Sequence, residues 1–144
     1  MSEKVVVITG ASRGIGAALV QGFQADGYHI VANSRNLQPA NDTNILSIAG
    51  DVADPDVAER LVAATLERWG RIDTLINNAG IFIAKPFVDY TLEDYNAVMS
   101  TNVAGFFHIT QRAARQMLKQ GSGHIVNVTT SLVDQPISAV PTGL

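Results

Sequence analysis

Short apolar runs alternate along the chain with longer segments in which apolar residues recur every three or four positions. The runs are rich in β-branched residues and lie at residues 4–8, 28–33, 45–49, 74–77 and 124–128. Continuous apolar runs of this length are typical of strands buried on both faces of a parallel sheet. The longer segments predict helices that pack on such a sheet, so the pattern indicates an α/β fold built from βαβ units.

The first of the longer segments predicts a helix that begins at Gly14. Gly27 follows its end and suits a C-terminal cap. Its apolar positions, Ile15, Leu19 and Phe23, recur every fourth residue, so they are expected to form the face that packs on the sheet.

The segment after the second strand differs from the others. Residues 36–44 contain a proline and several polar residues, so they predict a loop in place of a helix. Asp54 and Pro55 then suit the cap and the first position of the next helix. Trp69, near the end of that helix, is interpreted as a core residue.

A further helical pattern extends from Thr91 to the glycines at 121 and 123, and Thr91 has capping-box spacing to Asp94. The apolar or small positions expected on its buried side are Tyr95, Val98, Met99, Val103, Phe106, Phe107, Thr110, Ala113, Ala114 and Met117. Asn102 falls on the same side, where its amide needs partners. It either braces the helix end or holds a water at a reactive centre.

The glycine-rich stretch Thr9–Gly16 joins the first strand to the first helix. Its glycines, Gly10, Gly14 and Gly16, allow a tight turn and a close approach of the backbone to a ligand. The amide N–H groups at a helix start lack partners and suit a pyrophosphate, so the stretch predicts a dinucleotide site. A strand-to-helix turn without a ligand is the alternative.

The end of the second strand carries Ser34 and Arg35 where an NAD-binding unit usually has a carboxylate. Arg35, with Arg13 in the glycine turn, can pair with a 2′-phosphate. These residues predict NADP as the cofactor, with NAD less favoured. Solvated loop charges are the alternative for each arginine.

Two other strand ends carry candidate binding residues. Asp51 can accept a hydrogen bond from an adenine amino group, and the backbone of Val52 can donate one to a ring nitrogen; a turn aspartate is the alternative. The stretch Asn77–Gly80 follows the fourth strand, and its small and amide residues suit either a nucleotide or the joining of neighbouring loops.

Composition narrows the classes of function. A chain of 144 residues with 47% hydrophobic content suits one globular domain, expected to span residues 1–144. A net charge of −3 argues against a nucleic-acid partner, and the apolar runs are too short to cross a membrane. The chain has no cysteine and no signal-peptide pattern, so we expect a cytoplasmic location. Its three histidines show no metal-ligand spacing, and no metal site is expected.

Four motifs, Thr9–Gly16, Asp51–Val52, Asn77–Gly80 and Asn102–Gly105, stand in the order found in short-chain dehydrogenases/reductases, and the chain resembles the N-terminal part of that family. The resemblance implies a three-layer α/β/α Rossmann fold with a doubly wound parallel sheet, without the family's C-terminal strands and helices. It also implies hydride transfer between NAD(P) and a small-molecule carbonyl or alcohol.

The resemblance further implies the roles of single residues. Asn78 would contact the cofactor ribose, and Asn102 would be one of four catalytic residues with a Ser, a Tyr and a Lys. Thr130 falls at the serine position, and Ser131 would replace it after a one-residue loop shift. In a regular strand only one of these two hydroxyls can face the nicotinamide. The predicted cofactor-binding residues are Gly10, Ser12, Arg13, Gly14, Ile15, Gly16, Ser34, Arg35, Asp51, Val52, Asn78, Ala79 and Gly80.

The family's Tyr-x-x-x-Lys pair has no counterpart here, because none of Tyr28, Tyr90 and Tyr95 has a lysine four residues later. We therefore expect an NADP-dependent oxidoreductase as the full-length protein and no activity from residues 1–144 alone. A non-catalytic dinucleotide-binding or sensing protein is the alternative. The missing elements would leave the fifth strand and the helix at 103–119 partly uncovered, and the family commonly forms homo-oligomers through that helix.

Overall fold

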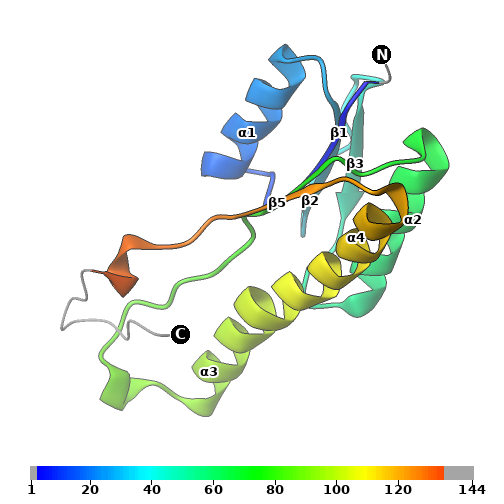
Figure 1. The fold of residues 1–144 in the computed structure, drawn as a ribbon. Coiled ribbons are helices and arrows are strands. Elements are labelled where there is room, and N and C mark those ends of the chain that lie inside the picture. Colours follow the sequence, from blue (N-terminus) through cyan, green and yellow to red (C-terminus); the bar gives the residue numbers. More distant parts are fainter. Residues whose placement is uncertain (1–2, 135–144) are drawn as a thin grey trace.

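The computed structural model describes residues 3–134, which form a parallel five-stranded sheet with helices against both faces (Figure 1). The strands are β1 (Val5–Thr9), β2 (His29–Ser34), β3 (Ile45–Ala49), β4 (Thr74–Asn77) and β5 (His124–Asn127). Their order across the sheet is β3-β2-β1-β4-β5, and every pair is parallel. This is the order of a Rossmann sheet, as the resemblance implied.

The helices complete the three layers. They are α1 (Gly14–Ala25), α2 (Pro55–Trp69), α3 (Leu92–Val98) and α4 (Gly105–Gln120). Helix α1 covers one face of the sheet, and α2 and α4 cover the other (Figure 1). The π-helical segment Met99–Ala104 joins α3 to α4, and short 3₁₀ turns lie at Phe87–Asp89 and Ser131–Val133. The predicted α/β/α fold is confirmed.

The central strand β1 shows why the strands are apolar throughout. Val5 and Val7 belong to the core between the sheet and helices α2 and α4, together with side chains such as Leu61. Val6 and Ile8 belong to the core on the α1 side. Successive side chains of a strand point to opposite faces, so a strand covered on both faces has apolar residues at every position.

The chain reverses its direction across the sheet at β1. From β1 it moves outward to β2 and β3 on one side, and it then crosses to β4 and β5 on the other side. The carboxyl ends of β1 and β4 therefore lie side by side, with their following loops leading away from each other. In doubly wound sheets this reversal point is where ligands bind.

The predicted helix starts and the predicted loop are confirmed. The Asp54 carboxylate accepts a hydrogen bond from the N–H of Asp56 at 2.9 Å. Thr91 and Asp94 form the expected capping box. Residues 36–44 contain no helix or strand.

The expected buried face of α1 is wrong at Ile15, whose side chain is 61% exposed. Leu19 and Phe23 do pack against the core on the α1 side. Helix α1 begins beyond the carboxyl end of β1, so its first turn does not lie over the sheet. Periodicity gives the direction of a side chain but not where the sheet ends.

The buried stripe along α3 and α4 also differs from the prediction. Its buried residues are Val98, Gly105, Ile109, Ala113 and Met117. The residues that were expected to be buried but are more than one third exposed are Tyr95, Val103, Phe106 and Phe107. The prediction assumes one α-helical period across residues 99–104, whereas this segment is π-helical, and a π-helical turn contains more residues and shifts the phase of the apolar positions.

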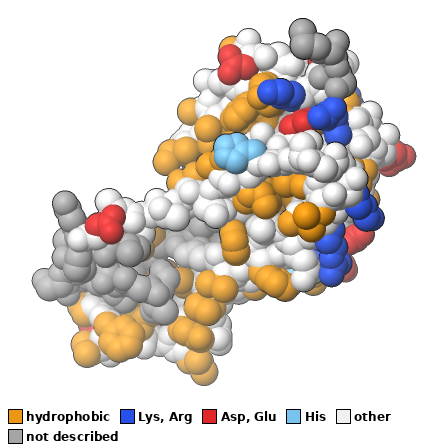
Figure 2. Space-filling model, in the orientation of Figure 1, with side chains coloured by type: hydrophobic (Ala, Val, Ile, Leu, Met, Phe, Trp, Pro, Cys, Tyr) orange, Lys and Arg blue, Asp and Glu red, His pale blue; other side chains and the backbone are white. Residues whose placement is uncertain are grey.

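Some apolar surface is uncovered, as expected. Among the described residues β5 pairs only with β4, and Val128 just beyond it is 41% exposed. Leu118 on α4 is 82% exposed, and Figure 2 shows apolar side chains spread over this face.

The segment Val140–Leu144, where the sequence shows no Tyr-x-x-x-Lys pair, lies outside the described residues. Within residues 3–134 no helix is both long and apolar enough to cross a membrane.

Asp73 connects the amino-terminal ends of three strands. Its carboxylate accepts hydrogen bonds from the N–H of Val5 and the Nε of Arg71, both at 2.8 Å. Its backbone carbonyl accepts one from the N–H of His124 at 2.8 Å. Burial raises the pKa of this carboxyl, but the hydrogen bonds from Arg71 and Val5 outweigh burial and hold the pKa below its usual value.

The substitution Asp73→Asn should lower the free energy of unfolding at neutral pH by about 1.5–3 kcal/mol, the range for hydrogen bonds to charged groups. Because the folded-state pKa is lowered, the carboxylate's contribution is complete above its usual pKa of 3.8 and is lost as the pH falls through the folded-state value. Urea unfolding across this pH range should show wild type and variant converging at low pH. A difference that stays constant with pH would contradict this role of Asp73.

Candidate functional site

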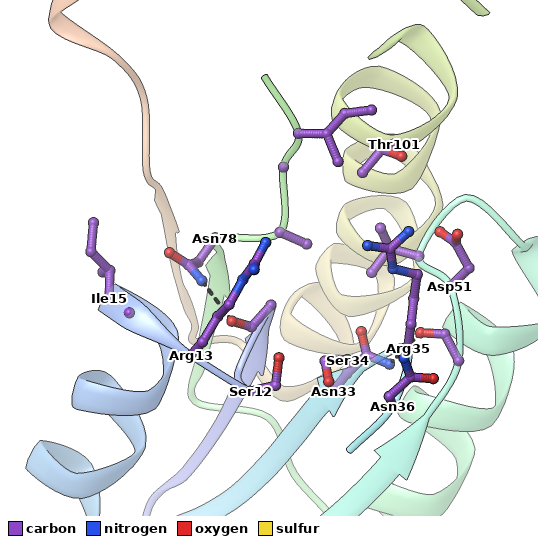
Figure 3. Close-up of a pocket in the computed structure, with 17 residues that line it drawn as sticks. Ser12, Arg13, Ile15, Asn33, Ser34, Arg35, Asn36, Asp51, Asn78 and Thr101 are labelled. Atoms are coloured by element: carbon purple, nitrogen blue, oxygen red, sulfur yellow. Dashed lines mark hydrogen bonds between the residues drawn. The ribbon is translucent and has the colours of Figure 1, made fainter. Parts of the chain in front are cut away.

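A cavity of about 460 Å³ opens at the carboxyl edge of the sheet, where the chain reverses between β1 and β4 (Figure 3). The glycine turn, the end of β2, the loops after β3 and β4, and the π-helical segment all contribute to it. Of the thirteen residues predicted to bind the cofactor, all except Gly16 line the cavity. They are Gly10, Ser12, Arg13, Gly14, Ile15, Ser34, Arg35, Asp51, Val52, Asn78, Ala79 and Gly80.

Two close approaches explain the glycines of the turn. A Cβ atom at Gly16 would lie 2.1 Å from the carbonyl oxygen of Gly10. A Cβ atom at Gly10 would lie 2.9 Å from the Cα of Ala79 and 2.9 Å from the Nδ2 of Asn78. Gly10 also has a φ of 67°, which strains any L side chain. The turn therefore holds α1 and the β4 loop at distances that require glycine.

The first turn of α1 is open to an anion. Arg13 at its N-cap makes no side-chain capping bond, and the first turn contains no acidic residue. Unpaired amide N–H groups and the positive end of the helix dipole favour a negative charge there. Gly14 and Ile15 bring this helix end into the wall of the cavity, so a pyrophosphate fits the site.

Asn78 and Thr9 fasten the carboxyl ends of β4 and β1 together. The Asn78 Nδ2 donates to the carbonyl oxygens of Thr9 at 3.0 Å and Gly10 at 3.2 Å. The Thr9 hydroxyl accepts from the N–H groups of Asn78 at 3.1 Å and Ala79 at 3.0 Å. The sequence allowed either a structural or a binding role for Asn78. Its amide N–H₂ group joins the loops, and the residue also lines the cavity.

Positive charge dominates the cavity wall. Figure 3 shows Arg13 extending from the glycine turn and Arg35 from the end of β2. Both residues are exposed, and Ser34 precedes Arg35 where a carboxylate would repel a phosphate. Asp51 is the one carboxylate among the described residues that line the cavity.

The loop after β3 is shaped by local contacts. The Asp51 Oδ1 accepts a hydrogen bond from the N–H of Ala53 at 3.0 Å, which is the turn role that the sequence allowed as an alternative. Asp51 also lines the cavity, so the turn contact leaves this residue in the cavity wall. Val52 is buried against Gly105, where a Cβ atom would lie 2.7 Å from the Val52 Cγ2. The glycine at the start of α4 is therefore a packing requirement of this loop.

Asn102 lies in the π-helical segment and pairs with the backbone of Ile81. Its Oδ1 accepts from the Ile81 N–H at 2.8 Å, and its Nδ2 donates to the Ile81 carbonyl oxygen at 2.9 Å. The amide therefore has the partners that an inward position requires. These bonds hold the loop after β4 in the wall of the cavity, and π-helical turns often occur at functional sites.

A second anchor fixes the chain beyond this loop. The Asp94 carboxylate accepts hydrogen bonds from the ammonium of Lys85 and from the backbone and hydroxyl of Thr91. The hydrogen bond from Lys85, followed by those from Thr91, lowers the pKa of Asp94 to about 2. Asp94 is therefore ionised near neutral pH and ties the loop to the start of α3.

Neither candidate for the catalytic serine position is among the residues that line the cavity. Strand β5 ends at Asn127, one residue before the predicted end. Thr130 caps a 3₁₀ turn, and its hydroxyl accepts from the N–H of Leu132 at 3.2 Å, while Ser131 lies inside that turn. The alternation of a regular strand therefore does not apply to Thr130 and Ser131, and it does not decide between them.

The cavity is also lined by residues that the sequence motifs did not identify as binding residues. They are Asn33, Asn36, Gly50, Ile81 and Thr101. Asn33 interrupts an apolar strand pattern with an amide, and that signal was present in the sequence. In residues 3–134 no cluster of His, Cys, Asp or Glu could hold a metal ion.

The sequence of this chain is similar to those of known dehydrogenases and reductases. A family model for short chain dehydrogenases matches residues 4–142. The chain is 35% identical over 140 residues to a 3-oxoacyl-(acyl-carrier-protein) reductase of Synechocystis sp. and 38% identical over 137 residues to a gluconate 5-dehydrogenase of Gluconobacter oxydans. These alignments cover 90% and 89% of the chain, but only 57% and 54% of the two relatives.

Solved structures show the same relation. A short chain dehydrogenase from Bacillus anthracis has a TM-score of 0.89 at 28% identity, over 96% of this chain and 62% of that protein. A variant of ElxO with NADPH bound has a TM-score of 0.88 at 26% identity, over 96% of this chain and 60% of that protein. The chain thus spans little more than half the length of the relatives it matches, and it belongs to the short-chain dehydrogenase/reductase family, corresponding to the N-terminal part of its fold.

Proposed function

We propose that this chain is the cofactor-binding part of an NADP-dependent oxidoreductase that acts on a small-molecule carbonyl or alcohol. The observation that carries the proposal is the pair Arg13 and Arg35 in one cavity, at a strand end without a carboxylate. Two guanidinium groups suit a 2′-phosphate, whereas an acidic residue there would favour the free hydroxyls of NAD.

Each part of the cavity has a role in this proposal. The first turn of α1 binds the pyrophosphate, and Arg13 and Arg35 bind the 2′-phosphate. Asp51 and Val52 contact adenine. Because the Asn78 Nδ2 is engaged with backbone carbonyls, contact with the ribose falls to its Oδ1. When bound, the cofactor supplies the hydride that passes between nicotinamide C4 and a carbonyl carbon.

The relatives support the class of reaction and cofactor. Their names describe a 3-oxoacyl reductase and a gluconate dehydrogenase, both of which interconvert carbonyl and alcohol groups. One structural neighbour has NADPH bound. As part of a complete enzyme of this family, Asn102 and either Thr130 or Ser131 would belong to the catalytic centre, with the hydroxyl donating to the substrate oxygen. We also propose that the protein is a cytoplasmic homo-oligomer.

A non-catalytic dinucleotide-binding protein is the second candidate. The observation that favours it is that no tyrosine in residues 1–144 has a lysine four residues later. A Tyr-x-x-x-Lys pair shortly beyond Leu144 in a longer protein would favour the enzyme.

Replacing Arg13 and Arg35 together by alanine should weaken NADPH binding about tenfold or more and leave NADH binding nearly unchanged. The reason is that hydrogen bonds to charged groups contribute about 1.5–3 kcal/mol each, and only NADPH has the 2′-phosphate. Titration calorimetry with both cofactors measures the two effects.

The matched control is Arg115→Ala with Lys119→Ala, which removes the same charge from exposed positions on α4. This control should bind both cofactors like the wild type. An equal loss for NADPH and NADH in the Arg13 and Arg35 variant would contradict the assignment of NADP.

Residues 1–144 alone should bind NADPH without consuming it in the presence of ketones or aldehydes, because they contain no counterpart of the family's tyrosine acid. The absorbance of NADPH follows turnover, and an intact-mass measurement verifies the sample. Steady oxidation of NADPH by this verified chain would show that another residue donates the proton.

A further inference from the structure

Asn33 is a buried amide in the wall of the cofactor cavity. Asn33 is the second-last residue of β2 and is 0% exposed. It lines the cavity beside Ser34 and Arg35 (Figure 3). The Nδ2 donates to the carbonyl oxygens of Ile48 at 3.0 Å and Gly50 at 3.1 Å. Both partners are acceptors, so they fix which end of the amide is nitrogen.

Asn33 and its neighbour connect three of the segments that form the cavity. The backbone carbonyl oxygen of Asn33 accepts a hydrogen bond from the N–H of Ala11 in the glycine turn at 2.9 Å. Its side chain holds the loop after β3 through Gly50, and the Gly50 N–H donates to the carbonyl oxygen of Ser34 at 3.1 Å. The segments expected to bind pyrophosphate, 2′-phosphate and adenine therefore meet at this strand end.

The other half of the amide has no structural use. The Asn33 Oδ1 is buried and finds no hydrogen-bond partner among the described residues. An unpaired buried acceptor is destabilising, and the preceding positions in β2, Val31 and Ala32, are apolar. The amide of Asn33 therefore acts through the two bonds of its Nδ2, which join the tip of β2 to the end of β3 and the loop after it.

We propose that Asn33 is a positioning residue for the adenosine half of the cofactor. It fixes the loop at residues 50–52 relative to the tip of β2, so that adenine and the 2′-phosphate are bound at the same time. This inference rests on the proposed function. It involves no contact between Asn33 and the ligand, because the Nδ2 is engaged and the Oδ1 is buried.

The two halves of the cofactor separate a positioning role from a general loss of structure. Adenosine 2′,5′-bisphosphate represents the adenosine half, and nicotinamide mononucleotide represents the other half. Asn33→Ala should weaken binding of the bisphosphate about tenfold, since two hydrogen bonds are lost, and leave the mononucleotide within about twofold of wild type. NMR titration of residues 1–144 measures both affinities.

A second variant guards against simple unfolding. Asn33→Leu has nearly the same shape without donors, so it should retain more thermal stability than the alanine variant while losing the same affinity for the bisphosphate. Asn77 gives a matched control, because it ends strand β4, which is separated from β2 by β1, and its amide is also bonded only through Nδ2. Its Nδ2 donates to Thr110 and Asn127, both at 2.9 Å, and its Oδ1 is unpaired. Asn77→Ala should lower Tm without weakening the bisphosphate.

Three results would overturn the inference. The first is full affinity for the bisphosphate in both Asn33 variants, and the second is an equal loss for both cofactor halves. A loss of bisphosphate affinity in Asn77→Ala equal to that in Asn33→Ala would be the third. Wild-type protein that binds neither NADPH nor the bisphosphate would reject the proposed function itself, and the role of Asn33 with it.

Discussion

The approach of α1 to the end of β1 is the constraint on which the cavity depends. It leaves no room for a Cβ atom at Gly16, which would lie 2.1 Å from the Gly10 carbonyl oxygen. This proximity places the unpaired amides of the first helical turn at the carboxyl edge of the sheet, beside the β4 loop that Asn78 and Thr9 secure. The position of this helix end therefore follows from backbone packing, and in the proposed function the side chains around it supply selectivity for the cofactor.

The sequence predicted the fold well because the responsible signals are local. The apolar run of β1, the cap at Asp54 and the box at Thr91 act over a few residues, and all are present in the structure. The glycine turn was also predictable, since a strand, three glycines and a helix have few compact arrangements. Strand order followed from the resemblance, because composition and periodicity carry no information on which strands pair.

Errors arose where the outcome depends on distant parts of the chain. Ile15 has the period of a buried residue but lies beyond the sheet, and Tyr95 precedes a π-helical segment that shifts the helical phase. The alternation expected at Thr130 assumes a regular strand, whereas β5 ends at Asn127 and the Thr130 hydroxyl caps a turn. Asn33 was overlooked because its importance comes from Ile48 and Gly50, which lie 15 and 17 residues away.

The polar groups around the cavity divide into two kinds. The amide nitrogens of Asn33, Asn78 and Asn102 are all bonded to backbone carbonyls and hold loops in place. The guanidinium groups of Arg13 and Arg35 are exposed and remain available to a ligand. The bonded amides give the cavity its shape, and in the proposed function the exposed charges select the phosphate. Because screening weakens exposed charges far more than buried hydrogen bonds, salt should reduce the proposed preference for NADPH before it disturbs the shape of the cavity.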